Sequence, residues 1–259
     1  MKVGVCIKST PDTDTRIKIA GGGDGIDPAG VKWIISPYDS FALEQGALTK
    51  EKLGGECVLF SVGGADAKKN LSDGLAIGGD RAVLVDDPAM KGADSLAVAR
   101  ALAAAIKAEG SEIVFCGKQA IDDDNVQVPA MIAELLDWPH VSMVNEFSID
   151  GDTFTAARNM GGGARERVTG KLPVVITTDR GLNTPRYAKL PDIMKAKTKK
   201  FETKKVEQLG LSAADVAPAL TTSAWSLPAD RAKGKMLSGD AASQVKELMR
   251  LLREEAKVI

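Results

Sequence analysis

Short apolar runs alternate with amphipathic stretches along the first half of the chain. Apolar runs of strand length occur at 3–7, 56–62, 81–85 and 112–116. Between and after them, apolar residues recur at helical spacing over 39–53, 66–77, 94–109 and 125–136. Asp39 stands where it can cap the first of these helices, and Gly110 where the third can end. The alternation predicts repeated strand–helix units.

The predicted strands are apolar at consecutive positions, as in 58–60, 82–85 and 113–115, and do not alternate with polar residues. Strands buried on both faces have this pattern, which predicts a parallel sheet covered by helices. With right-handed crossovers the result is an α/β fold with a Rossmann-like, doubly wound, mostly parallel sheet. Such sheets bind ligands beyond the carboxyl ends of their strands, so the loops after Ile7, Val62, Val85 and Cys116 are the first candidates for a site.

From about residue 140 the pattern becomes shorter and more alternating. The runs 141–149, 153–159, 165–169 and 174–178 predict an antiparallel hairpin that continues the sheet. An irregular segment and a basic stretch lead to residue 205, and residues 206–236 are polar with little periodicity. The segment 241–256 predicts an amphipathic helix. We therefore expect an α/β domain over 1–205 and a C-terminal arm with a helix over 206–259.

Charge and composition narrow the function. The formal net charge of -1 gives no electrostatic reason to expect nucleic acid or an anionic membrane as a partner, and no apolar run is long enough for membrane insertion. The three cysteines, Cys6, Cys57 and Cys116, lie inside apolar runs, which favours buried thiols in a reducing compartment, by default cytoplasmic. A single histidine, His140, excludes a site built from several histidines, and no metal-ligand spacing occurs.

The segment 117–127 follows the fourth predicted strand and leads into a helix. Its glycine allows a ligand to approach the backbone closely, and the first helical turn offers free N–H groups to a phosphate. The side chains that can donate hydrogen bonds are Lys118, Gln119, Asn125 and Gln127. The acidic residues 122–124 would repel a phosphate but could accept from ribose or adenine. Two interpretations remain open at this point: a nucleotide-binding loop, and an ordinary capped strand-to-helix loop.

A second unusual segment places apolar residues in a polar loop beside prolines. These residues are Tyr187, Leu190, Ile193 and Met194. Exposed apolar side chains on a rigid loop suggest a protein contact, although a loop that folds back onto the core fits the sequence equally well. The neighbouring basic run 195–200 is typical of a solvated strip.

Six blocks, in this order, resemble the beta subunit of electron-transfer flavoproteins. They are Cys-Ile-Lys at 6–8, Ser-Pro-Tyr-Asp at 36–39, Ala-Ile-Gly-Gly-Asp-Arg-Ala at 76–82, Gly-Lys-Gln-Ala-Ile-Asp at 117–122, Leu-Asn-Thr-Pro-Arg-Tyr at 182–187 and Leu-Pro-Asp-Ile-Met-Lys-Ala-Lys at 190–197. The last two are close to the family signature. The chain departs from the family at Ser36, where asparagine is common, and at 159–163, where Asn-Met-Gly-Gly-Gly replaces an acidic hairpin.

The resemblance implies an adenine-nucleotide-binding α/β subunit of a heterodimer, which acts as an electron carrier without catalytic residues of its own. The alpha subunit carries the redox FAD, and this chain holds a structural AMP, or a second FAD in the electron-bifurcating branch. The loop 184–197 resembles the family's recognition loop, which docks acyl-CoA or other dehydrogenases and a quinone reductase. The arm 206–259 is expected to dock on the alpha subunit. The competing class is a stand-alone adenine-nucleotide sensor with the same fold.

Residue by residue, the resemblance places the two sites. The cofactor-binding positions are Cys6, Ser36, Pro37, Tyr38, Asp39, Val62, Gly117, Lys118, Gln119, Ala120, Ile121, Asp122, Asp123, Asp124, Asn125, Val126, Gln127 and Val128. The docking positions are Tyr187, Leu190, Pro191, Ile193 and Met194. The three acidic residues resemble AMP-binding members, whereas 6–8 followed by 11–13 resembles the bifurcating branch. Because bifurcating members tend to carry glycine where Asp123 stands, we expect AMP.

Overall fold

The structure is a computed structural model that describes residues 1–230 and 233–259. The chain divides into two units, Met1–Ala224 and Trp225–Ile259. Within the described residues, no helix has the length and apolar character needed to cross a bilayer.

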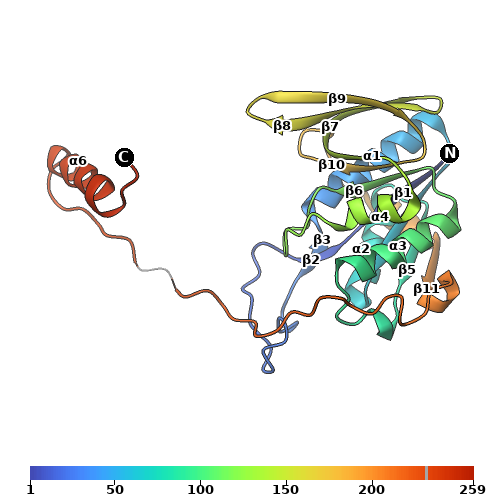
Figure 1. Cartoon of the computed structure of the whole chain (residues 1–259), viewed down its shortest axis with the longest axis horizontal. Coiled ribbons are helices and arrows are strands. Elements are labelled where there is room, and N and C mark those ends of the chain that lie inside the picture. The colour runs from blue at the N-terminus through green and yellow to red at the C-terminus, as the bar shows by residue number, and fades with distance from the viewer. Residues whose placement is uncertain (231–232) are drawn as a thin grey trace. The chain divides into compact units, whose positions relative to one another are not determined.

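The larger unit is built on one sheet of nine strands in the order β11-β5-β4-β1-β6-β10-β7-β8-β9 (Figure 1). The strands are β1 Lys2–Cys6, β4 Glu56–Val62, β5 Arg81–Val85, β6 Ile113–Gly117, β7 His140–Asp150, β8 Thr153–Gly161, β9 Ala164–Lys171, β10 Val174–Thr178 and β11 Lys200–Lys204. Strands from β11 to β7 pair in parallel, and β7, β8 and β9 form an antiparallel meander. The predicted α/β, Rossmann-like, mostly parallel fold is confirmed.

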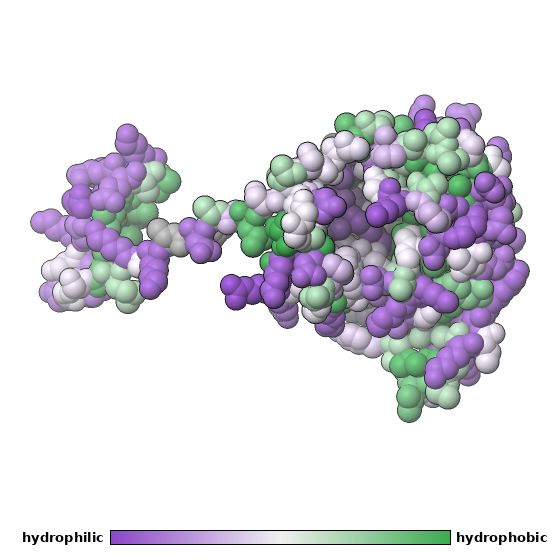
Figure 2. Space-filling model, turned by 90° about the horizontal axis from the view of Figure 1, so that it is seen from below, coloured by the Kyte–Doolittle hydropathy of each residue, from purple (hydrophilic) through white to green (hydrophobic). Residues whose placement is uncertain are grey.

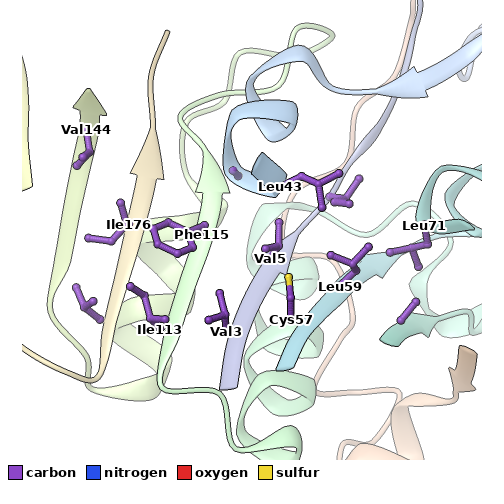
Figure 3. Packing of buried hydrophobic residues seen from close by; sticks show 14 of the residues in the cluster. Val3, Val5, Leu43, Cys57, Leu59, Leu71, Ile113, Phe115, Val144 and Ile176 are labelled. Atoms are coloured by element: carbon purple, nitrogen blue, oxygen red, sulfur yellow. The ribbon is translucent and has the colours of Figure 1, made fainter. Parts of the chain in front are cut away.

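Helices cover both faces of the parallel strands. On one face, α1 (Pro37–Leu53) and α2 (Ala65–Ile77) pack on a core that includes Val5, Leu59 and Phe115. Figure 3 shows these three residues on the neighbouring strands β1, β4 and β6. On the other face, α3 (Ser95–Glu109) and α4 (Val128–Leu136) enclose a second core around Phe60 and Ile132. Two buried faces explain why the parallel strands are apolar throughout.

The placement of residues 174–178 in the antiparallel hairpin is wrong. β10 lies between β6 and β7 and pairs in parallel with both. All of its residues are buried, as in a strand that is covered on both faces. The informative signal is the run of three consecutive apolar residues, Val174–Ile176, not the position of the strand after three alternating ones.

Two helices carry a proline in their first turn and do not begin where the sequence pattern predicted. Ser36 is the N-cap of α1, so Asp39 lies in the first turn and does not cap the helix. α4 begins at Val128 and not at residue 125, with a proline in its first turn. Proline lacks an N–H and has a fixed φ, so it suits the first turn, where that N–H would have no helical acceptor.

Several short elements were not predicted. β2 (Ser9–Pro11) and β3 (Trp33–Ile35) form a separate antiparallel pair. The predicted recognition loop contains a short helix, α5 (Leu190–Ala196), and the basic stretch after it contains the edge strand β11. β11 pairs in parallel with β5, and Glu202 forms an ion pair with Arg81. Edge strands are often short and charged, so their sequences lack a strong strand signal. Two 3-10 turns, η1 (Pro88–Met90) and η2 (Val206–Leu209), complete this unit.

The smaller unit contains the predicted C-terminal helix. α6 spans Ala241–Arg250 and continues as a π-helical turn, η3, over Leu251–Glu255. The carboxylate of Asp240 caps it by accepting from the backbone N–H of Ser243. No residue of α6 is buried within the described structure. Figure 2 shows hydrophobic residues exposed on this segment among hydrophilic ones.

Candidate functional site

The sheet reverses its strand order at β1, which lies between β4 and β6. The helices that precede these two neighbours, α1 and α3, cover opposite faces of the sheet. A doubly wound sheet binds its ligands in the crevice at this point, beyond the carboxyl ends of the strands. The segment after β1, the segment after β6 and the start of α1 meet here, and together they contain most of the predicted nucleotide-binding residues.

A buried carboxylate joins these three segments. Asp39, in the first turn of α1, accepts the backbone N–H of Lys8 at 2.7 Å and that of Gly117 at 2.9 Å. Lys8 lies just after β1 and Gly117 is the last residue of β6, so Asp39 binds one N–H group at the end of each strand. A Cβ at residue 117 would lie 2.4 Å from Asp39 Oδ1, so the close approach requires glycine here. Asp39 therefore fixes the geometry of the crevice.

The protonation of Asp39 is expected to make the stability of the protein depend on pH. Burial raises the pKa of Asp39 from 3.8 to about 7, although the two N–H groups and Lys8 favour the charged form. The folded state therefore binds this proton more tightly than the unfolded state does. The stabilisation is complete below about pH 4 and is lost as the pH rises to about 7.

We therefore expect the free energy of unfolding of the wild type, relative to that of Asp39→Asn, to fall between about pH 4 and pH 7 and then to level off. Urea titrations of both proteins across this range measure the difference. A relative stability that rises with pH would show that the hydrogen bonds to Asp39 outweigh its burial.

The acidic residues after Gly117 are paired within the protein. Lys8 Nζ lies 2.8 Å from both Asp122 Oδ1 and Asp123 Oδ2, and so bridges the segments that follow β1 and β6. Burial alone would lower the pKa of Lys8, but the hydrogen bonds to these carboxylates raise it above its ordinary value. Asp124 accepts from Gln119 Nε2 at 2.7 Å, and Asn125 Nδ2 donates to Asp123 at 3.0 Å. The ion pairs with Lys8 reduce the repulsion that Asp122 and Asp123 would exert on a phosphate.

Lys118 is not free to donate a hydrogen bond to a phosphate, because its ammonium group is bound within the protein. Its Nζ pairs with Asp179 Oδ1 at 2.8 Å and lies 4.8 Å from the centroid of the Tyr38 ring. Both charged partners are largely buried, and a cation over an aromatic face is favourable. The pairing couples the end of β10 to the crevice, a link that the sequence analysis missed. Asp179 directly follows β10. Ligands of parallel sheets bind beyond the carboxyl ends of the strands, so a prediction that placed β10 in the parallel part of the sheet would have included Asp179 among the candidates.

Two features near the carboxyl ends of the parallel strands fit a nucleotide. Among the residues that the structure describes, Ser36 Oγ is buried and has no hydrogen-bond partner, so a polar ligand could satisfy it. A hollow of about 310 Å³ lies beside Val62 at the ends of the neighbouring strands β4 and β5, where Gly63, Gly64 and Met90 help to line it, and its volume is within the size range of small-ligand sites. Gly64 is the N-cap of α2 and provides no side-chain cap, so the first N–H groups of that helix remain available.

The predicted contact at Cys6 lies beneath the crevice and not in its wall. Cys6 and Cys116 are buried in the core covered by α3 and α4, and both are free thiols. A hydrogen bond with Cys6, together with burial, raises the pKa of Cys116 well above its ordinary value. Burial also raises the pKa of Cys57 to about 12. The thiols of Cys57 and Cys116 therefore stay protonated, and both residues act as small apolar side chains.

The predicted docking residues are exposed on and next to α5. The exposed fractions are 93% for Tyr187, 74% for Leu190 and 58% for Met194. Pro191 and Ile193 are also exposed. The structure thus excludes the alternative that this segment folds its apolar side chains back onto the core.

The fold defines a Rossmann-like α/β protein with a crevice at its topological switch point. Comparison with known proteins identifies the family. A family model described as electron transfer flavoprotein domain matches residues 25–209. The electron transfer flavoprotein subunit beta of Bacillus subtilis (strain 168) is 39% identical over 260 residues, which cover 100% of both chains. The human protein of the same name is 35% identical over 256 residues, 97% of this chain and 99% of its own. The chain belongs to the electron-transfer flavoprotein beta-subunit family.

Proposed function

We propose that this chain binds AMP in the crevice at the topological switch point, as one half of a heterodimer with an alpha subunit. The observation that supports this most strongly is the Asp39 junction, which joins the start of α1 to the ends of β1 and β6. The positions that would hold the nucleotide are Ser36–Asp39, Val62 and 117–128, with Cys6 packed beneath. The FAD of the alpha subunit would supply the redox chemistry, and this chain would support that subunit.

AMP is preferred over a second FAD because of the turn at Asp123. Its carboxylate is bound to Lys8 and Asn125, and the turn it belongs to would have to rearrange to admit the longer phosphate arm of a flavin. The backbone φ of Asp124 is 49° and that of Val126 is 55°, a region that non-glycine residues adopt only when the surrounding structure holds them there. We infer that the surrounding structure holds the backbone of this turn in a single conformation, and that this conformation suits the shorter nucleotide.

The composition of the purified complex tests this assignment. The chain should be co-expressed with its alpha subunit, the heterodimer denatured, and the released nucleotides quantified. We expect one FAD and one AMP per heterodimer. Two FAD and no AMP would establish the bifurcating type, and neither nucleotide would refute binding in the crevice. A stable monomer that binds ATP alone would instead indicate a stand-alone sensor.

We further propose that α5 docks electron-transfer partners, namely acyl-CoA or other dehydrogenases and a quinone reductase. Leu190 is the most exposed apolar residue of the helix, and a large apolar side chain that enters a partner's pocket can dominate the binding energy. An anchor away from the redox centre would let the flavin domain move while the partner stays bound. In this proposal the chain carries no catalytic residue, and its buried free thiols suit a reducing compartment.

A further inference from the structure

Helix α5 is too short to be stable without contacts to the rest of the protein. It spans seven residues, none of them buried, and its N-cap residue, Lys189, makes no side-chain cap. Helices of this length are unstable in isolation, because their few hydrogen bonds do not offset the free-energy cost of nucleating the helix. The helix packs against α2, with Ala196 against the core, and contacts on either side of the helix further restrict the orientation of Leu190.

On the N-terminal side, Arg186 provides an extensive contact with α1. Its Nε and Nη2 donate to the two carboxylate oxygens of Glu44, each at 2.8 Å, and its backbone N–H donates to the same group at 3.1 Å. Its Nη1 and Nη2 also donate to Glu51, at 2.5 and 3.1 Å. Glu44 is only 5% exposed. A planar guanidinium that binds two carboxylates restricts both the position and the orientation of the backbone that carries it.

Two further contacts bracket the segment. Asn183 Nδ2 donates to the backbone carbonyl of Phe41 in α1 at 3.0 Å. On the C-terminal side, Lys199 Nζ donates to the carbonyls of Leu75 and Gly79 at 2.8 and 2.6 Å, at the end of α2. Arg186 is the last anchored residue before the exposed Tyr187 and Leu190. It therefore controls the end of α5 that carries the docking side chain.

We propose that Arg186 is a positioning residue for partner docking, and that its bonds to Glu44 and Glu51 hold Leu190 in the orientation that a partner binds. This inference rests on the proposed docking role of α5. The free helix is then already ordered, so association does not have to pay for ordering it. Loss of the bonds from Arg186 to Glu44 and Glu51 raises the KM for the partner but leaves the rate of electron transfer within the bound complex unchanged.

The test is Arg186→Lys in the full heterodimer, with amide exchange and partner kinetics as readouts. Lysine keeps the charge opposite the buried Glu44 but loses the fork that spans both carboxylates, so we expect about tenfold faster amide exchange over 187–196 and an about fivefold higher KM. The KM refers to an acyl-CoA dehydrogenase reduced by its acyl-CoA, and kcat and nucleotide content should not change. Arg186→Gln combined with Glu44→Gln should have a larger effect without burying an unpaired charge.

The matched control is Arg165→Lys, which alters an arginine paired with Glu146 in the meander and should change neither readout. Unchanged exchange and unchanged KM in both Arg186 variants would overturn the inference. Leu190→Ala separates it from the docking proposal itself. If Leu190→Ala leaves KM unchanged, α5 does not dock the partner and both proposals fail. If Leu190→Ala raises KM but the Arg186 variants do not, only the positioning role fails.

Discussion

Gly117→Ala is expected to abolish nucleotide retention and to lower the free energy of unfolding by about 3 kcal/mol, the scale of a backbone clash combined with a lost buried hydrogen bond. The added Cβ would lie 2.4 Å from Asp39 Oδ1 and 2.8 Å from both Asp39 N and Tyr38 C. Two of these atoms belong to the backbone at the start of α1, which cannot retreat unless the helix moves. The hydrogen bond from Gly117 to Asp39 would be lost as well. Nucleotide quantification and urea unfolding of the heterodimer measure the two effects.

Gly25→Ala serves as the matched control for this substitution. A Cβ at residue 25 would meet no atom within 4 Å, and its φ is not in the left-handed region. This variant should retain its nucleotide and its stability. Full nucleotide content in Gly117→Ala would contradict binding in the crevice, because that substitution must displace the end of β6 or the start of α1.

The parallel core was predictable because a strand that is buried on both faces is apolar at consecutive positions in the sequence. Val58–Phe60 and Ile113–Phe115 are apolar at every position, and both prove to be inner strands of the sheet. Strands at the edge of the sheet do not have this pattern. Lys200–Lys204 is mostly polar because it pairs on one edge only, and its partner strand, not its own composition, makes it a strand.

The location of the candidate site also followed from the sequence, but its electrostatics did not. Strand-end loops can be placed once the strands are known, so Lys8 and Gly117 fall at the crevice by topology alone. Which charges pair depends on distances between segments far apart in the chain, such as Lys8 with Asp122 and Lys118 with Asp179. No local pattern encodes those distances, and for that reason the sequence suggested Lys118 as a free donor where the structure has an ion pair.

This pairing changes what the crevice offers a nucleotide. Both lysines that border it, Lys8 and Lys118, are neutralised by carboxylates of the same chain. A phosphate would therefore rely on backbone N–H groups, such as those at the uncapped start of α2. We expect a site of this kind to depend more on backbone shape than on any single charge, which is why glycine at residue 117 matters more than the lysine beside it.

Leu248→Glu is expected to weaken the heterodimer about a hundredfold, since burial of a carboxylate in an apolar contact costs about 3 kcal/mol. Val245, Leu248, Met249 and Leu252 lie on one face of the C-terminal helix, and the first three are exposed within the described residues. An apolar face of this kind is stable when a partner covers it, and we propose that the alpha subunit does so. Ser243→Glu makes the same change in charge on the opposite face and should leave the dissociation constant unchanged. Sedimentation of the two variants measures it, and equal affinities would show that α6 lies outside the interface.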